Sequence, residues 1–203
     1  ISHSSNGFVR VWYDQSVTTQ AGDTATGNHA VQATAGNQPL IVSAGSVLSG
    51  LDFDGSTSSR FLVAPSVSGL TGSLSMFSAS VRDLTGHPVS LSSSSSNSRY
   101  FAIQEAGSTS VANPRNTANI TASDSVSGST RLTFALTTGA TSTSAGALGS
   151  AVTTSTSDYG DDFSGSNLDQ IAIGILRTVS PTGYFNGRIR EILVYTSDQT
   201  DNR

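Results

Sequence analysis

The densest acidic cluster in the sequence is a candidate metal site. Asp158, Asp161 and Asp162 lie close together in a segment that is otherwise rich in Ser and Gly. Ca²⁺ binds oxygen ligands, usually about six to eight of them, and Asp carboxylates are common among these ligands. We therefore name these three residues as candidate Ca²⁺ ligands. The alternative is an acidic loop that contacts only solvent.

Three aromatic residues are candidates for sugar binding. Tyr159 and Phe163 lie in the same Gly-, Asp- and Ser-rich segment, and Tyr100 follows a Ser-rich run. A sugar site combines an aromatic surface with polar groups that bond the sugar hydroxyls. Trp12 lies in an apolar segment, so we expect it in the core instead. Asp14 is interpreted as a residue that makes a buried hydrogen bond or caps a turn, because Asp readily bonds nearby backbone.

Carboxylates that could hydrolyse a glycosidic bond are few. That reaction needs two carboxyl groups about 5 Å apart in retaining enzymes, or about 6.5–9.5 Å apart in inverting ones. The chain has two Glu, Glu105 and Glu191, which are far apart in sequence, while Asp52 and Asp54 share a face of a predicted strand. We expect a protein without enzymatic activity, with a glycosidase as the alternative.

Histidine and cysteine do not suggest a transition-metal site. His3, His29 and His87 are scattered and are interpreted as surface or turn residues, and there is no Cys. The sequence therefore contains neither a disulfide nor a thiolate ligand. Asn119 begins a glycosylation sequon, which matters only in a secretory pathway.

The composition favours an all-β domain. The 203 residues include 38 Ser, 24 Thr and 20 Gly, while all 10 basic residues are Arg. This composition is poor for helices. A net charge of −4 argues against nucleic-acid binding, and no apolar run is long enough to span a membrane.

The length suits one domain over residues 1–203, which we interpret as a fragment of a longer chain because it begins with Ile1 and shows no signal peptide.

Short apolar segments separated by turn residues predict about ten to twelve strands, which is typical of a β-sandwich or barrel. The clearest predicted strands are residues 8–13, 39–42, 51–54, 60–63, 73–82, 89–91, 99–104, 131–136, 168–176 and 185–195. Segment 145–152 is ambiguous.

Finer expectations follow from alternation along the strands. In 51–54, Leu51 and Phe53 should face inward, and 60–63 should pair back on this strand as a hairpin. The Ser run 92–96 should be an exposed turn or flexible loop. In the last strand, Ile189 should share a face with Leu193 and Tyr195, and both faces should be covered. In 73–82, one face should carry Phe77, Ala79 and Val81, and the other Leu74, Met76 and serines.

Several blocks occur in an order that resembles the laminin-G-like branch of the concanavalin A-like lectin/glucanase superfamily, most closely the form found in tailed-bacteriophage virion proteins. The blocks are VWYDQS at 11–16, NHAVQAT at 28–34, NQPLIV at 37–42, LDFDGS at 51–56 and FNGRIREILVY at 185–195. The chain departs from the family pattern by an insertion at 17–27.

The resemblance implies a two-sheet antiparallel jelly-roll sandwich. It also implies that Ca²⁺, if bound, would be held at the rim of the sandwich, as in lectin relatives. Glucanases of the superfamily carry a Glu-x-Asp-x-(x)-Glu motif that is absent here, whereas fungal arabinofuranosidases share a related YDQS segment and keep an enzyme conceivable.

The function expected from these observations is that of a phage virion surface domain, such as a decoration, fibre or spike module. Its partners would be host-surface glycan, other virion proteins, or both, and we expect a homo-oligomer because outer strand edges with few charges need protection. The alternative is a carbohydrate-binding module of a secreted bacterial protein.

Overall fold

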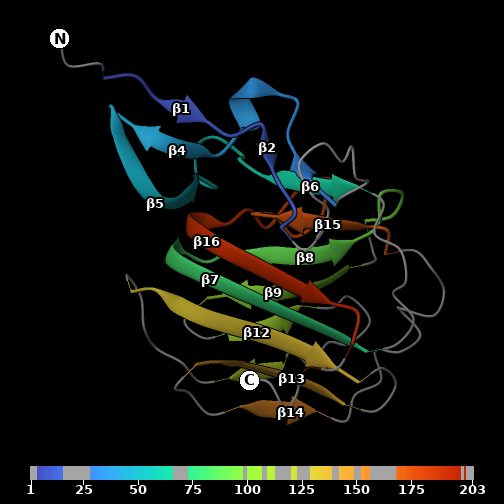
Figure 1. Cartoon of the computed structure of the whole chain (residues 1–203). Helices are drawn as coiled ribbons and strands as arrows, with labels where there is room; N and C mark the ends of the chain where they lie inside the picture. Colours follow the sequence, from blue (N-terminus) through green and yellow to red (C-terminus); the bar gives the residue numbers. More distant parts are fainter. Residues whose placement is uncertain are drawn as a thin grey trace.

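The chain folds into two antiparallel sheets packed face to face (Figure 1). The computed structural model describes residues 4–15, 28–65, 73–97, 100–106, 109–112, 120–122, 129–138, 142–148, 152–155, 168–197 and 199. Within these residues the only helix is a short 3-10 turn, Ala35–Asn37, so no helix there could cross a membrane. The predicted all-β jelly-roll sandwich is confirmed.

The sheet in front in Figure 1, sheet A, combines strands from both ends of the chain. Its order is β1-β4-β5-β16-β7-β12-β13-β14, so the last strand lies between β5 and β7. The strands are β1 (Gly7–Phe8), β4 (Leu40–Ser43), β5 (Ser46–Phe53), β7 (Leu74–Leu84), β12 (Arg131–Thr137), β13 (Thr143–Ala147), β14 (Thr153–Ser155) and β16 (Asn186–Tyr195).

Behind it lies sheet B, in the order β11-β10-β9-β8-β15-β6-β3-β2. Its strands are β2 (Val11–Trp12), β3 (Ala30–Val31), β6 (Leu62–Pro65), β8 (Val89–Ser92), β9 (Tyr100–Glu105), β10 (Thr109–Ala112), β11 (Ile120–Ala122) and β15 (Gln170–Ile173). Sheet B therefore also joins early and late segments of the chain.

The core lies between the sheets and is built by side-chain alternation. On β5, Leu51 and Phe53 are buried while Asp52 lies on the other face, as predicted. On β7, Leu74 and Met76 pack into the core and Phe77 faces away from it, also as predicted. Burial of such apolar side chains drives the packing of the two sheets.

A β-bulge in β16 overturns one expectation about faces. The register with β7 shifts between Ile189 and Glu191, so the extra residue Arg190 reverses the alternation at that point. Ile189 is consequently fully buried with the core, next to Ile192, and does not share a face with Leu193. The outer face of β16 is also not covered as expected, because Leu193 and Tyr195 are about two-fifths exposed.

The hairpin expected between 51–54 and 60–63 is not formed. After β5 the Asp54 carboxylate accepts hydrogen bonds from the backbone N–H groups of Ser56 and Thr57, each 3.1 Å long, which closes a turn. The chain then crosses to sheet B, where β6 pairs with β15 and β3. A local turn signal cannot show whether the next strand returns to the same sheet.

Two polar segments are more buried than expected. Ser92 and Ser93, at the start of the Ser run, are fully buried, and the Ser93 hydroxyl accepts hydrogen bonds from the N–H groups of Ser95 and Ser96. His87 is only 5% exposed, and its Nδ1 lies 2.9 Å from the carbonyl oxygen of Gly183. The expectations of an exposed run and a surface histidine are wrong for these residues.

His87 gives a pH prediction. Burial lowers the pKa of His87 to about 4, so the folded chain keeps the ring neutral where the unfolded chain binds a proton. Stability should therefore fall as pH drops from about 6.5 towards 4, by about 3 kcal/mol in total. Urea titrations across this range should show the slope, and His87→Asn, which keeps a donor but does not titrate, should flatten it. An unchanged slope in the variant would contradict the prediction.

Candidate functional site

A cleft of about 660 Å³ opens between the two sheets where β2 and β3 of sheet B face β16 of sheet A. It is formed by strands from both ends of the chain, so only the folded structure assembles it. Its volume falls within the range of small-ligand sites. Its lining residues are Trp12, Tyr13, Asp14, Gln15, Asn28, Ala30, Ala64, Ile171, Ile173 and the β16 segment 190–195.

The floor of the cleft is apolar and belongs to the core. Ala30, Ala64 and Ile173 are almost fully buried, and Ile171 and Ile192 pack against them. A floor of this kind gives a rigid surface, because its side chains are fixed by packing on both sheets.

Trp12 and Tyr13 form an aromatic wall. Trp12 is half-buried and packs against the core, as expected. It also lines the cleft, so the expectation of a core residue holds only in part. Tyr13 is 61% exposed, and its ring meets His29 edge-on with centroids 5.0 Å apart. Trp12 ends β2, whereas Tyr13 lies just after the strand, where its exposed ring contacts His29.

Hydrogen bonds fix this wall to β3. The Asp14 N–H donates to Nδ1 of His29 at 3.0 Å, and the Asn28 N–H donates to Oδ2 of Asp14 at 3.2 Å. The Gln15 side chain donates to the Tyr13 carbonyl at 3.2 Å. The Asp14 carboxylate therefore bonds backbone, although its partner is Asn28, 14 residues away, and not a residue of its own turn as expected. These bonds fix the backbone that carries the aromatic pair.

Charged groups lie on the opposite wall. Arg190 and Glu191 are exposed residues of the β16 bulge, and both line the cleft. The Arg190 guanidinium donates a 3.4 Å hydrogen bond to the Ser49 hydroxyl. Bulges often re-aim side chains beside binding sites. After the bulge, Glu191 pairs with Ala79 and Leu193 with Phe77, so the Glu191 side chain shares a face with Leu193, and Arg190 is the extra residue of the bulge.

Most of the site residues proposed from sequence lie outside this cleft or outside the described residues. Tyr100 is half-buried on β9 and is not part of the lining. The other candidates, namely Tyr159 and Phe163 for sugar and Asp158, Asp161 and Asp162 for Ca²⁺, lie outside the described residues, as do His3 and Asn119. Among the residues that the structure describes, no three His, Asp or Glu side chains gather in a way that could hold a metal ion.

Glu105 lies between the sheets and not at a surface. It is fully buried, and its Oε1 accepts hydrogen bonds from Ser80 at 2.7 Å and Thr133 at 2.9 Å. Burial raises the pKa of this carboxyl, although the two hydrogen bonds and the nearby charges of Arg131 and Arg82 act to lower it. The residue acts as a structural acid of the interior.

Asp52 and Asp54 also have structural partners. Asp52 forms an ion pair with Arg60 at 3.1 Å, although burial raises its pKa overall. Hydrogen bonds from Thr57, together with those from Ser56, hold the pKa of Asp54 well below its usual range. Both carboxylates are therefore used within the fold.

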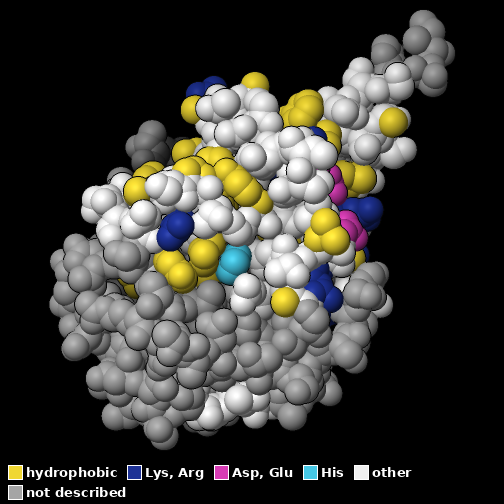
Figure 2. Space-filling view, turned by 180° about the vertical axis from the view of Figure 1, so that it is seen from behind, with side chains coloured by type: hydrophobic (Ala, Val, Ile, Leu, Met, Phe, Trp, Pro, Cys, Tyr) yellow, Lys and Arg dark blue, Asp and Glu magenta, His cyan; other side chains and the backbone are white. Residues whose placement is uncertain are grey.

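Sequence reasoning missed Tyr13, Asn28, Arg190 and Glu191 as members of one site. The available signal was the segment 12–15, in which two adjacent aromatic residues are followed by two polar ones. Two neighbouring aromatic residues next to polar residues indicate that one of the two rings is exposed to solvent. Figure 2 shows the face behind that of Figure 1, where charged side chains of both signs gather along the right-hand edge of the described part.

Comparisons with known proteins bear on the fold. No protein-family model matches the sequence, and no curated protein matches it either. A solved structure of a mutant of the sialidase NanB from Streptococcus pneumoniae is similar, with 17% identity and a TM-score of 0.54. The match covers 67% of this chain and 23% of that one, so this chain spans less than a quarter of NanB.

Binding domains of botulinum neurotoxin are similar as well. The serotype D/C domain is 14% identical with a TM-score of 0.53, and the match covers 75% of this chain and 41% of the other. The domain of neurotoxin DC in complex with rat synaptotagmin II is 13% identical with a TM-score of 0.52, covering 75% and 40%. At these identities the likeness establishes the β-sandwich fold.

Proposed function

We propose that this chain is a non-catalytic glycan-binding domain and that the cleft beside Trp12 and Tyr13 is its binding site. The observation that carries the proposal is the composition of the cleft. An apolar floor and two aromatic rings offer a surface for the apolar face of a sugar, while Asp14, Gln15 and the bulge residues offer partners for hydroxyls.

The comparisons support this proposal at the level of architecture. The similar structures come from a sialidase and from toxin binding domains, one of them in complex with rat synaptotagmin II, so β-sandwiches of this kind occur in proteins with these roles. We further propose that the domain is displayed on a phage virion, where host-surface glycan and other virion proteins would be its partners. The secreted carbohydrate-binding module is the other setting considered.

Replacing Tyr13 with Ala should weaken glycan binding about tenfold or more. Tyr13 is exposed, so its removal deletes ring contacts with the ligand without opening the core. A stacked aromatic ring contributes on the order of 1 kcal/mol or more to binding, and 1.4 kcal/mol corresponds to tenfold. A glycan array identifies the ligand, and calorimetry with that ligand measures the change.

Tyr100→Ala is the matched control, because this Tyr is outside the cleft. Its affinity should equal that of the unaltered chain. Loss of binding in Tyr100→Ala with full binding in Tyr13→Ala would place the site elsewhere. Repeating the array in EDTA tests the proposed Ca²⁺ site at Asp158, Asp161 and Asp162, whose contribution would appear as loss of binding without the metal.

The two carboxylates at the cleft, Asp14 and Glu191, make hydrolysis the alternative to be tested. Because Asp14 accepts a backbone hydrogen bond, we assign it a structural role. Incubation of the bound glycan with the chain should therefore release no product. Hydrolysis that is lost in Glu191→Gln would overturn the non-catalytic part of the proposal.

A further inference from the structure

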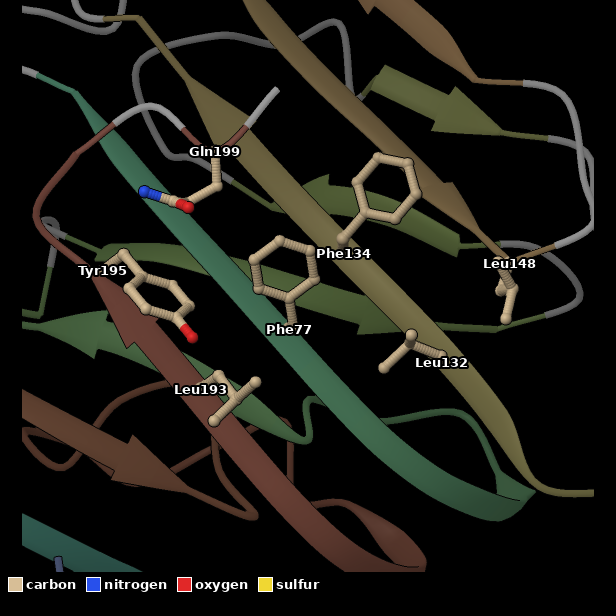
Figure 3. A pocket seen from close by; sticks show the side chains of 7 residues that line it. All are labelled: Phe77, Leu132, Phe134, Leu148, Leu193, Tyr195 and Gln199. Atoms are coloured by element: carbon tan, nitrogen blue, oxygen red, sulfur yellow. The ribbon is translucent and has the colours of Figure 1, made fainter. Parts of the chain in front are cut away.

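A second hollow lies on the outer face of sheet A (Figure 3), and it shares Leu193 and Tyr195 with the lining of the cleft. It has a volume of about 220 Å³. Its lining comes from β7, β12 and β16 and from the segments that follow β13 and β16, and consists of Phe77, Leu132, Phe134, Leu148, Leu193, Tyr195 and Gln199. None of these side chains carries a charge.

The floor of the hollow is aromatic and fixed. The ring of Phe77 lies between the rings of Phe134 and Tyr195, with centroid separations of 6.3 and 6.2 Å. Phe134 lies over Gly146 of β13, where a Cβ atom would come within 2.7 Å of the ring. The absence of a side chain at Gly146 thus lets the ring lie down and leaves the space above it open.

The rim, in contrast, is exposed and apolar. Leu148 is 75% exposed, Tyr195 41%, and Leu132 and Leu193 38% each. These four belong to the ten large hydrophobic side chains that are exposed in the described part of the chain, so exposed apolar surface is concentrated here. A contiguous patch of this kind on a soluble domain marks an interaction surface.

The chemistry of the lining argues against a sugar in this hollow. Its only polar side-chain groups are the Tyr195 hydroxyl and the Gln199 amide, both at one end (Figure 3). A pyranose would lose water from most of its hydroxyls without gaining partners, which is costly. An uncharged apolar surface suits an equally apolar protein surface.

We propose that the occupant is a second copy of this chain, packed face to face on sheet A about a two-fold axis. Leu148 stands at one end of the hollow, and Leu193 and Tyr195 stand at the other (Figure 3). A two-fold axis that lies in the plane of the contact, across the line from Leu148 to Leu193, brings Leu148 of each copy against Leu193 and Tyr195 of the other. A protruding residue and a recess on the same face are what an isologous contact requires.

The area available is sufficient for such a dimer. Four strands that are about 4.8 Å apart and about eight residues long form a face of about 500 Å² on each copy. A dimer would therefore bury about 1,000 Å² in total, without counting the extra surface of the protruding side chains. Specific interfaces begin at about this size. Because no charges line the hollow, the contact should persist in high salt.

Sedimentation velocity of the 203-residue chain at rising concentration tests the proposal. We expect a dimer that is retained in 1 M NaCl, since the contact is apolar. Leu148→Glu should give a monomer, with a dissociation constant raised at least a hundredfold. Val47→Glu, at a side chain 78% exposed on β5 outside the hollow, should leave the dimer intact. A monomeric unaltered chain, or a dimer that tolerates Leu148→Glu, would overturn the proposal.

Cysteine cross-linking gives a second readout that does not depend on a destabilising charge. The chain has no Cys, so Leu148→Cys and Leu193→Cys each introduce a single thiol. Under mild oxidation, a mixture of the two variants should form a mixed disulfide faster than either variant forms its own. Equal rates for all three pairs would contradict the two-fold arrangement.

Discussion

Replacing Gly174 with alanine should lower the free energy of unfolding by about 4 kcal/mol, or prevent folding. Gly174 directly follows β15 and has a φ of +79°, a conformation that L side chains rarely adopt. A Cβ atom there would come 2.2 Å from Cδ1 of Phe53, which is fully buried and cannot move aside. Backbone strain and overpacking therefore add at one position.

Gly36→Ala is the control for this prediction. Nothing lies within 4 Å of the position that its Cβ would take, and its φ is not in the left-handed range. This variant should stay within about 0.5 kcal/mol of the unaltered chain. Urea unfolding followed by circular dichroism measures both. A Gly174→Ala chain within about 1 kcal/mol of the unaltered chain would show that the packing at Phe53 is looser than described.

Replacing Glu105 with alanine should cost about 4 kcal/mol, the second large effect. The carboxylate accepts bonds from Ser80 and Thr133 and lies near the buried residues Arg82 and Arg131. Removing the carboxylate takes away the hydrogen-bond acceptor of the two hydroxyls and the negative charge near the two arginines. Removing one partner from a buried group of charges typically costs about 3–5 kcal/mol.

Glu105→Gln separates the hydrogen bonds from the charge. It keeps an oxygen acceptor for Ser80 and Thr133, so it should cost much less than Glu105→Ala. Because burial raises the pKa of Glu105, the folded chain binds a proton more tightly than the unfolded chain, and stability should fall as pH rises above about 4.5. Glu105→Gln should remove this fall. Equal stability of the two variants would contradict the role assigned to the carboxylate.

Strand pattern was sufficient to predict the fold class, because each sheet buries one face and alternation records which face it is. The assignments on β5 and β7 follow directly from this. Two of the errors share a physical origin, namely events that break local periodicity. The bulge at Arg190 reverses the faces of β16 before Ile192, and the crossing after Asp54 sends the next strand to the other sheet.

The cleft was harder to predict than the fold. Its two walls, at Trp12–Gln15 and Arg190–Glu191, come from opposite ends of the chain and meet only when β2 and β16 take their places. Sequence spacing contains no measure of that proximity. Local composition favoured the Asp- and aromatic-rich segment 158–163 instead, and its role as a sugar or Ca²⁺ site stays a prediction.

The most direct test of the proposed binding site uses the single Trp of the chain. Trp12 lines the cleft, so its fluorescence reports on this site alone. A glycan selected on the array should change Trp12 emission in a saturable way, with the same dissociation constant as calorimetry gives, and Tyr13→Ala should weaken both. Saturable binding by calorimetry with no change in Trp12 emission would show that the glycan binds elsewhere and would contradict the assignment of the cleft.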